Sequence, residues 1–335
     1  MTVDAVSRAE SLCARGRELC QARRLEEAVE VYKEALAIYR QLAQQHPHGY
    51  LREVASTLRA LADTLYSLCR LDEAIDAYRE SLTIHQQLTP EIFDSRSSTE
   101  KWDVFSLHSP TEAWLVSSVG GTLNNLGNAL SKQGDLKAAI EAYQQSAEIF
   151  RRLVGSLPGG VFEFFLASVL SNLGVAYSEL SQWDLAAKAY QESLHNFRRS
   201  ASEYPEESDF GIAQSLRRLG KTLHHLQQSE EALKALEKAS AILRRLARRR
   251  SPKYEPELAE TLVDLGQVLL EMRRLKASVQ AYEEAYRIYR RLAHQQPQEY
   301  QTHLESTRMH LQRALSAWLG SETAVQKRLA RLDKC

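Results

Sequence analysis

The chain has 335 residues, of which 44% are hydrophobic and 26% are charged, with 43 basic and 43 acidic side chains. This composition is too apolar for a disordered chain and too charged for a membrane protein, and the zero net charge gives no overall field that would attract nucleic acid. Because only 14 Gly and 8 Pro are available for turns, the sequence favours a strongly helical fold over an all-β fold.

The N-terminal residues carry acidic side chains and lack the apolar segment of a signal peptide. No later stretch reaches about 18 uninterrupted apolar residues, so we expect a cytoplasmic protein with no membrane partner. The cysteines are too sparse for a disulfide framework, and none of them form a CxxC pair. Cys13 and Cys20 share one helix face, and we interpret them as small buried side chains without metal or redox chemistry.

Three columns of residues recur along the chain with a period of about 46 residues, which is the range that indicates stacked repeats. The first column holds a small residue, at Gly16, Ala62, Gly127, Gly174, Gly220 and Gly266. The second holds Ala or Ser, at Ala28, Ala74, Ala139, Ala186, Ala232 and Ser278. The third holds a large side chain, at Tyr32, Tyr78, Tyr143, Tyr190, Leu236 and Tyr282.

The columns fit pairs of antiparallel helices. A small residue in the first helix lets the second helix cross it at close range. The apolar positions of the second helix are spaced by three and four residues, which gives one buried stripe. Asp135 and Asp184 precede second helices as predicted N-caps. Prolines mark the turns between repeats, because proline does not continue a helix, and they stand at Pro47, Pro158, Pro205, Pro252 and Pro297.

This pattern resembles the tetratricopeptide repeat, and the resemblance extends over nearly the whole chain. It departs from the family at the first large position, where Leu12 and its five equivalents replace the usual Trp. The resemblance implies an all-α fold, a right-handed α-solenoid of stacked antiparallel helical hairpins. The family unit has 34 residues, and we expect most of the additional residues of the longer period to extend the second helix.

We therefore predict a single solenoid over residues 1–335. Its repeats span about 9–54, 55–89, 120–166, 167–212, 213–258 and 259–302. A capping helical pair is predicted at 303–335, because a terminal repeat needs a polar outer face. Residues 90–119 form an insertion between the second and third repeats.

The insertion is rich in aromatic side chains, with Phe93, Trp102, Phe105 and Trp114, and its prolines and serines exclude one long helix. One interpretation is that it folds back to cover apolar surface at an irregular junction. The other is that these aromatic residues form a lid on the groove or a hydrophobic anchor for a partner.

Catalytic signatures are missing from the sequence, which has no HExxH, GxSxG or GxGxxG motif. Gly220-Lys221-Thr222 is similar to the end of a Walker A motif, but Ser215 replaces its first glycine. Adjacent histidines at 224 and 225 point about 100° apart on a helix and have no spaced partner ligands. We expect no enzymatic activity, no cofactor and no metal site.

The resemblance implies that the first helices line a concave groove that binds a peptide or a partner helix. Asparagine is suited to this role because its amide matches both groups of a peptide main chain, whereas Arg59, Arg217 and Lys221 would meet acidic groups. The alternative is that these are solvated helix residues. The predicted groove residues are Arg59, Asp63, Tyr66, Asn124, Asn125, Asn128, Lys132, Ser171, Asn172, Arg217, Lys221, His225 and Gln267.

Arginine also recurs on the solvent side of the second helices, at Arg40, Arg151, Arg152, Arg198, Arg199, Arg244, Arg245, Arg290 and Arg291. We interpret this arginine column as a solubilising face paired with acids of adjacent repeats. Contact with an acidic protein or a nucleic acid is the alternative, and the neutral net charge argues against it.

Taken together, the sequence predicts a non-catalytic scaffold or adaptor whose concave groove binds a peptide or helix of another protein, with an acidic segment favoured. The alternative is a ligand- or peptide-responsive regulatory switch that controls an effector protein. We do not expect a nucleic-acid partner, and the sequence leaves homo-oligomerisation open.

Overall fold

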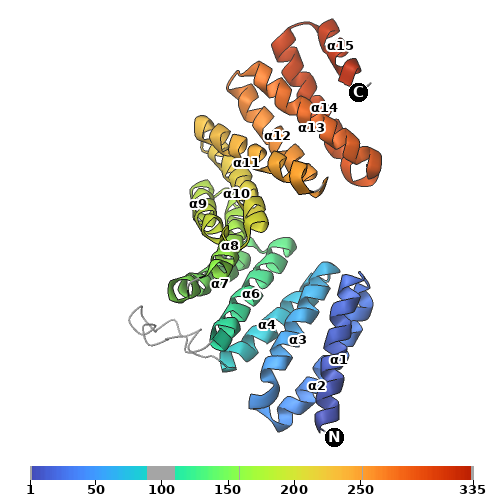
Figure 1. Cartoon of the computed structure of the whole chain (residues 1–335), viewed down its shortest axis with the longest axis vertical. Coiled ribbons are helices and arrows are strands. Elements are labelled where there is room, and N and C mark those ends of the chain that lie inside the picture. Colours follow the sequence, from blue (N-terminus) through green and yellow to red (C-terminus); the bar gives the residue numbers. More distant parts are fainter. Residues whose placement is uncertain (1, 89–109, 158, 251, 333–335) are drawn as a thin grey trace. The chain divides into compact units, whose positions relative to one another are not determined.

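The computed structural model describes residues 2–88, 110–157, 159–250 and 252–332, and within these ranges all regular structure is helical (Figure 1). The chain divides into two compact units, an N-terminal unit of residues Met1–Leu180 and a C-terminal unit of residues Ser181–Cys335. Within each unit, consecutive helices pack against one another as antiparallel hairpins. The predicted all-α solenoid of stacked hairpins is confirmed.

The N-terminal unit is built so that the first helices of successive hairpins lie side by side. In addition to its neighbours in the chain, α6 contacts both α3 and α8. These three helices carry the predicted groove residues of this unit. The helices are α1 (Thr2–Gln21), α2 (Leu25–Gln45), α3 (Pro47–Ser67), α4 (Leu71–Leu88), α6 (Pro110–Gln133), α7 (Leu136–Ser156) and α8 (Gly160–Glu179).

The C-terminal unit follows the same plan, with α12 in contact with both α10 and α14. Its last helix closes the stack, because Val325 and Leu329 are buried in one cluster with Tyr282 and Tyr286. The helices are α9 (Trp183–Ser200), α10 (Pro205–His225), α11 (Ser229–Arg250), the short 3-10 helix η2 (Pro252–Tyr254), α12 (Glu255–Glu271), α13 (Leu275–Gln295), α14 (Pro297–Leu319) and α15 (Glu322–Leu332).

The first and third sequence columns meet inside the hairpins that contain Gly16, Gly127, Gly220 and Gly266. A Cβ atom placed on Gly127 would lie 2.6 Å from the ring of Tyr143, and one placed on Gly16 would lie 2.6 Å from the ring of Tyr32. The tyrosines of this column are almost fully buried; Tyr78, for example, is 1% exposed. The small residue is therefore required because the aromatic ring of the second helix occupies the space of its side chain.

Prolines mark the junctions between hairpins, as predicted. Pro47, Pro205 and Pro297 stand in the first turns of α3, α10 and α14, where a proline costs no intrahelical hydrogen bond, and Pro252 begins η2. Pro158 lies outside the described residues.

Two local features differ from the sequence prediction, and one agrees with it. Asp135 is the N-cap of α7 and accepts a hydrogen bond from the backbone N–H of Ala138 at 3.1 Å. The same prediction for Asp184 was wrong, because α9 already begins at Trp183. The extra residues of the long period also lengthen first helices, since α3 begins at Pro47 and α6 at Pro110, inside the predicted insertion.

Helix α8 is the one helix in the described residues that is long and apolar enough to cross a membrane. However, 61% of its apolar window is buried inside the protein. Neighbouring helices cover a helix inside a helical stack on several sides. Such a helix is therefore apolar on most of its surface, and its composition resembles that of a membrane span. We therefore regard α8 as a core helix.

Replacing Gly127 by alanine tests the packing column. We expect Gly127→Ala to lower the free energy of unfolding by about 1–3 kcal/mol, because the new methyl group overlaps the Tyr143 ring. The matched control is Gly121→Ala in the same helix, where nothing lies within 4 Å of the new Cβ. That variant should gain about 0.5–1 kcal/mol from helix propensity alone. Urea denaturation followed by circular dichroism measures both, and equal effects would contradict the packing role.

Candidate functional site

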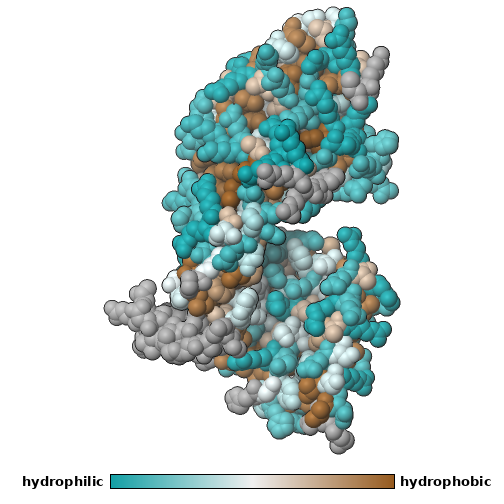
Figure 2. Space-filling view, in the orientation of Figure 1, coloured by the Kyte–Doolittle hydropathy of each residue, from teal (hydrophilic) through white to brown (hydrophobic). Residues whose placement is uncertain are grey.

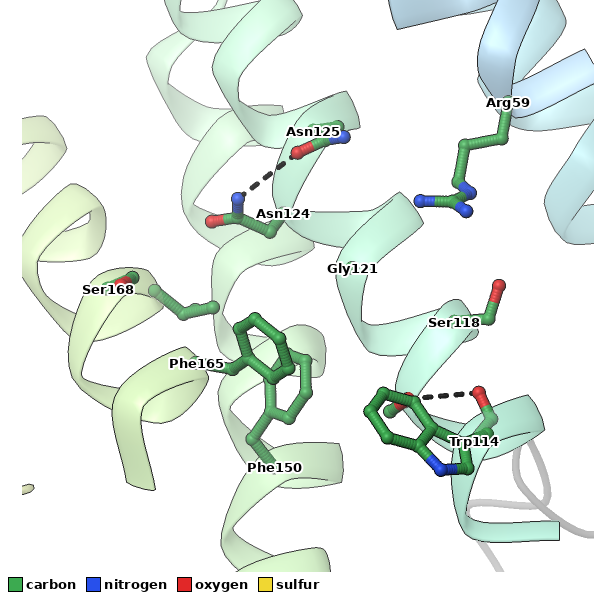
Figure 3. A pocket seen from close by; sticks show the side chains of 11 residues that line it. Arg59, Trp114, Ser118, Gly121, Asn124, Asn125, Phe150, Phe165 and Ser168 are labelled. Carbon is green, nitrogen blue, oxygen red and sulfur yellow. Dashed lines mark hydrogen bonds between the residues drawn. The ribbon is translucent and has the colours of Figure 1, made fainter. Parts of the chain in front are cut away.

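The N-terminal unit contains a pocket of about 410 Å³ where α3, α6, α7 and α8 meet (Figure 3). One part of its lining is apolar and aromatic, and the other part is polar and includes an arginine. The lining residues are Arg59, Trp114, Ser117, Ser118, Gly121, Asn124, Asn125, Phe150, Phe165, Ser168 and Val169. The volume lies within the range of sites that hold a small molecule or a few side chains of a peptide.

Aromatic rings form the apolar part of the pocket. The ring centroids of Phe150 and Phe165 are 5.5 Å apart, and Phe165 is 36% exposed. Trp114 is 58% exposed and also contacts Phe162, with ring centroids 6.2 Å apart. In the face shown in Figure 2, most exposed side chains are hydrophilic. Among the described residues, the exposed large aromatic side chains are Trp114, Phe165 and Trp318, and the first two line this pocket.

Small residues keep the pocket open between these rings. Gly121 has no neighbouring atom within 4 Å of the position that a Cβ would take. The hydroxyl groups of Ser117 and Ser168 donate to main-chain carbonyls of their own helices, each at 2.9 Å. These two hydroxyls are thus already satisfied, and the other polar side chains of the lining are Arg59, Ser118, Asn124 and Asn125.

Arg59 is a guanidinium group without an ion-pair or hydrogen-bond partner in the described part of the chain. Its Nε atom is buried and makes no hydrogen bond. Asp63, one helical turn further along α3, is the expected partner, but its carboxylate accepts from Tyr78 Oη at 2.6 Å and from Asn125 Nδ2 at 2.9 Å. Figure 3 shows the Arg59 side chain directed from α3 toward the pocket.

Four asparagines extend from the pocket as one hydrogen-bonded row, which we call the amide row: Asn125, Asn124, Asn172 and Asn128. Asn124 Nδ2 donates to Asn125 Oδ1 at 3.3 Å. Asn172 Nδ2 donates to the Oδ1 atoms of Asn124 and Asn128, at 3.1 and 3.2 Å. The sequence analysis predicted all four as groove residues suited to a peptide main chain, and the structure brings them together as a connected network.

Two buried tyrosines hold the ends of the amide row. Tyr78 donates to Asp63, and Tyr143 Oη donates to Asn128 Oδ1 at 2.7 Å. Burial raises the pKa of both tyrosines, and the Asp63 carboxylate raises that of Tyr78 further, so both phenols keep their protons and act as donors. Both tyrosines belong to the third sequence column, and this column therefore connects packing with the site.

His85 of α4 adds a neutral buried group near Arg59. Burial lowers the pKa of His85 to about 4, and the positive charges of Arg59 and Arg52 lower it as well. The imidazole is therefore uncharged at neutral pH. It adds no charge beside the guanidinium of Arg59.

The remaining predicted groove residues of the N-terminal unit lie away from the pocket. Lys132 Nζ lies 4.9 Å from the centroid of the Tyr66 ring and 3.2 Å from Cys69 Sγ, an arrangement that satisfies both Tyr66 and Lys132 locally. Ser171 is only 6% exposed. Of the predicted groove residues of this unit, Arg59, Asn124 and Asn125 line the pocket, whereas Tyr66, Lys132 and Ser171 do not.

The predicted cations of the C-terminal unit are already paired within the protein. Arg217 of α10 forms ion pairs with Glu257 at 2.8 Å, Glu260 at 3.1 Å and Asp264 at 3.3 Å, all on α12. Lys221 lies 3.8 Å from Asp264. Three carboxylates surround two cations, so Arg217 is not available to an acidic partner as the sequence analysis assumed.

His225 and Gln267 are also engaged. The His225 ring stacks on Trp183 with centroids 4.1 Å apart and planes at 7°. Gln267 donates to Glu271 at 3.3 Å. A smaller pocket of about 190 Å³ beside Arg217 is lined by Glu260 and Asp264 as well, and this acidic lining makes it a poor site for an anion.

The predicted lid residues divide between two parts of the chain. Phe93, Trp102 and Phe105 lie outside the described residues. Trp114 belongs to α6 and lines the pocket. The sequence missed Phe150 and Phe165 as site residues, because aromatic side chains at helical spacing indicate a core. The adjacent Phe164 and Phe165 were a usable signal, since two consecutive helix residues do not face the same side.

Six residues of the arginine column form ion pairs with acids: Arg40, Arg151, Arg152, Arg244, Arg245 and Arg291. Arg244 forms a bidentate pair with Glu284 of the next hairpin, at 2.8 and 2.7 Å, and Arg245 pairs with Asp209 at 2.7 Å. Arg291 pairs with Glu255 at 2.8 Å. These contacts follow the interpretation of the column as a paired, solubilising face. Among the described residues, no group of three or more His, Cys, Asp or Glu is placed to hold a metal ion.

Two models of the tetratricopeptide repeat match the chain. One matches residues 8–48, 54–89 and 119–158, and the other matches 165–245 and 211–291, which together make up most of the sequence. Among curated protein sequences, none is significantly similar to this chain.

Solved structures of repeat proteins are similar in fold. BtubC from P. vanneervenii has 20% identity and a TM-score of 0.57, with 81% of this chain and 92% of that chain covered. A signal transduction ATPase with a tetratricopeptide repeat sensor from Pyrococcus horikoshii has 15% identity and a TM-score of 0.66, with 97% of this chain and 41% of that chain covered. A putative kinesin light chain repeat protein from Podosopora anserina has 18% identity and a TM-score of 0.50, with 73% and 99% covered.

Removing Arg217 should destabilise the C-terminal unit. Glu257 and Asp264 have side chains that are 17% and 16% exposed, and without Arg217 they would remain partly buried with uncompensated charge. We expect Arg217→Met to lower the free energy of unfolding by about 3–5 kcal/mol. The control Lys221→Met removes a cation that is 53% exposed and should cost less than about 1 kcal/mol. Equal losses in chemical denaturation would contradict the assignment of Arg217 as a structural residue.

The pH dependence of stability should contain a term from His85. The unfolded chain binds the proton with a pKa near 6.5, whereas the folded chain binds it with a pKa of about 4. Stability from this group is therefore complete above pH 6.5 and falls as the pH falls toward 4, by about 2 kcal/mol at pH 5. His85→Leu should flatten this part of the curve of unfolding free energy against pH. An unchanged difference between pH 7.5 and pH 5 would contradict the buried neutral state.

Proposed function

The chain belongs to the tetratricopeptide repeat family, and we propose that it is a non-catalytic scaffold that binds a peptide segment of a partner protein. The proposed binding site is the pocket of the N-terminal unit together with the amide row. Tetratricopeptide repeats generally support protein interaction, and this supports the general part of the proposal. The cytoplasmic location expected from the sequence stays a prediction.

The single observation that carries the proposal is the unpaired Arg59 beside an open aromatic pocket. A cation that has no internal ion pair attracts a ligand carboxylate without first losing one. The exposed rings of Trp114 and Phe165 gain contact area when an apolar side chain covers them. Arg59 and these rings line the same cavity, so one ligand segment would satisfy both.

The amide row supports a peptide over an isolated small molecule as the ligand. It continues from the pocket to Asn128 and Asn172, along the first helices α6 and α8. A row of amides offers hydrogen bonds to successive main-chain groups of an extended segment. A segment that enters the pocket with one side chain would therefore lie along this row.

A regulatory switch is the second candidate. The structure from Pyrococcus horikoshii is described as a protein with a tetratricopeptide repeat sensor, and its resemblance to this chain extends to the fold. In a switch, the ligand binds one arrangement of the repeats more tightly than another and changes their spatial arrangement. A scaffold would bind its partner with little change in dimensions.

Peptide selection tests the scaffold. The purified full chain is used to select binders from a random peptide display library, and the affinity of selected peptides is measured by fluorescence anisotropy. We expect Arg59→Gln to weaken binding by about 10-fold or more, because one charge-assisted hydrogen bond is worth about 1.5–3 kcal/mol. The control Arg79→Gln removes one exposed cation from α4, outside the pocket, and should leave the affinity unchanged.

The results separate the two candidates and can overturn both. Failure to select any peptide, or equal binding by the wild type and Arg59→Gln, would reject the pocket as a peptide site. Small-angle X-ray scattering with and without a selected peptide then distinguishes the scaffold from the switch. A radius of gyration that changes on binding would favour the switch.

A further inference from the structure

We infer that the pocket of the N-terminal unit is an incomplete equivalent of the Arg217 cluster, and that one acidic side chain of the bound peptide completes it. The Arg217 cluster consists of Arg217 and Lys221 of α10 with Glu257, Glu260 and Asp264 of α12. This inference rests on the proposed peptide-binding function, and it specifies the charge of the peptide and the place where that charge binds.

The two sites occupy equivalent positions of their repeats. Arg59 and Arg217 each precede the small residue of the first sequence column by three positions. In the next first helix, the same column is marked by Gly127 and by Gly266, and the residues nine, six and two positions before each glycine are equivalent. The equivalent pairs are Ser118 and Glu257, Gly121 and Glu260, and Asn125 and Asp264.

The walls around the two sites are equivalent as well. Phe150 lines the pocket of the N-terminal unit, and its equivalent Tyr289 lines the smaller pocket beside Arg217. Ser168 and Thr307 also line the two pockets at equivalent positions. The two pockets therefore form at the same place in the repeat, although their volumes are about 410 and 190 Å³.

Gly121 leaves the larger pocket open where the smaller one contains a carboxylate. No atom lies within 4 Å of the position that a Cβ of Gly121 would take. At the equivalent position, Glu260 lines the smaller pocket and forms an ion pair with Arg217 at 3.1 Å. The N-terminal pocket thus has free space where a glutamate side chain stands in the C-terminal unit.

The missing carboxylate matches the atom that lacks a partner. In the Arg217 cluster, Nε of Arg217 donates to Glu257 at 2.8 Å. Ser118 stands at the equivalent position and has no carboxylate, and Nε of Arg59 is buried without a hydrogen bond in the described part of the chain. A ligand carboxylate at this point would restore the contact that Glu257 makes in the other unit.

The charge of the two sites indicates how many acids the ligand supplies. Two cations and three carboxylates give the Arg217 cluster a net charge of −1. At the equivalent positions of the N-terminal unit, Arg59 and Asp63 are the charged residues, so the net charge is zero. One added carboxylate reproduces the charge that this fold already accommodates, and a second would exceed it.

Selection of an acid over a neutral group depends on Arg59. Ser118, Asn124 and Asn125 line the pocket, but each of them can both donate and accept, so they accommodate a neutral amide as well as a carboxylate. The guanidinium group only donates, and its hydrogen bonds to a carboxylate are about twice as strong as those between neutral groups. Figure 3 shows Gly121 on α6 with Arg59 on one side and Phe165 on the other.

The internal equivalence allows a test without a ligand. Gly121→Glu places a carboxylate where Glu260 stands in the other unit, and Gly121→Gln is its neutral isostere. We expect the unfolding equilibrium constant of Gly121→Glu to be about fivefold smaller than that of Gly121→Gln, because its carboxylate pairs with Arg59. In an Arg59→Gln background, this advantage should disappear. Urea denaturation of the full chain measures all four variants.

Equal stability of the Glu and Gln variants, or the same difference in both backgrounds, would overturn the inference. If the variants at position 121 fail to fold, Ser118→Glu and Ser118→Gln provide the same comparison at the position of Glu257. The pair at 118 should then differ in the same direction, and only while Arg59 is present.

Two capped dipeptides, N-acetyl-Phe-Glu-amide and N-acetyl-Phe-Gln-amide, test the site from the side of the ligand. Each is titrated into the full chain and followed in ¹H–¹⁵N NMR spectra, which also show whether each variant is folded. We expect the wild type to bind the Glu dipeptide about fivefold more tightly than the Gln dipeptide, and Arg59→Gln to show less than about twofold preference. The control Arg79→Gln should retain the preference.

Gly121→Glu should bind the Glu dipeptide more weakly than Gly121→Gln does, because its own carboxylate already pairs with Arg59. No preference for Glu over Gln in the wild type, an unchanged preference in Arg59→Gln, or binding of neither dipeptide to the wild type would overturn the inference. Selected library peptides that bind without an acidic residue would overturn it while leaving the proposed function in place. Failure of the library selection would instead reject the proposed function.

Discussion

The contact between a small residue in one helix and a large ring in the next is the constraint on which both fold and site depend. Where Tyr143 covers Gly127, the two helices approach so closely that no side chain fits between them. The ring therefore projects through the hairpin, and its hydroxyl emerges on the first helix, where it donates to Asn128. Tyr78 reaches Asp63 in the same way, fifteen residues earlier in the chain. In α3 and α6, the tyrosines that repeat for packing thus also place a donor at a fixed point of a groove-lining helix.

The fold was predictable because its signal is short-ranged and repeated. A small residue and a large side chain sixteen positions apart, a tyrosine in all but one repeat, describe one hairpin, and six copies in register exclude coincidence. Helix boundaries were harder, because the start of α3 at Pro47 depends on how the preceding hairpin ends. The amide row was predictable in membership, since Asn125 and Asn172 occupy equivalent positions of their repeats, two residues before the glycines of the first column. Its direction was not, because that depends on which side chain ends the network, and this is a contact between residues 62 positions apart.

Arg59 and Arg217 show that the position of a residue within its repeat does not determine its interactions. They occupy the same position of their repeats, but Arg217 forms ion pairs and Arg59 does not. The acid one turn after Arg59 is engaged by Tyr78 and Asn125, and the guanidinium stays unpaired. The next first helix after Arg217 instead presents Glu257, Glu260 and Asp264 at ion-pair distance. A cation in a groove is available to a ligand only when the following repeat supplies no acid at the matching position. That comparison between repeats is possible from sequence, and it is more informative than the position of the arginine alone.

The lack of a partner for Arg59 raises the free energy of the unliganded protein and thereby favours ligand binding. A buried donor without a partner costs about 1–3 kcal/mol, and this chain pairs many of its other arginines, including Arg244, Arg245 and Arg291. The cost is present only in the free protein, because a carboxylate that reaches Arg59 removes it. The free energy of binding therefore includes the new hydrogen bond and the removal of this cost. Part of the affinity of the site thus comes from the unfavourable state of Arg59 in the unliganded protein. Arg217 carries no such cost in the free protein, because a ligand would have to displace the carboxylates with which it already forms ion pairs.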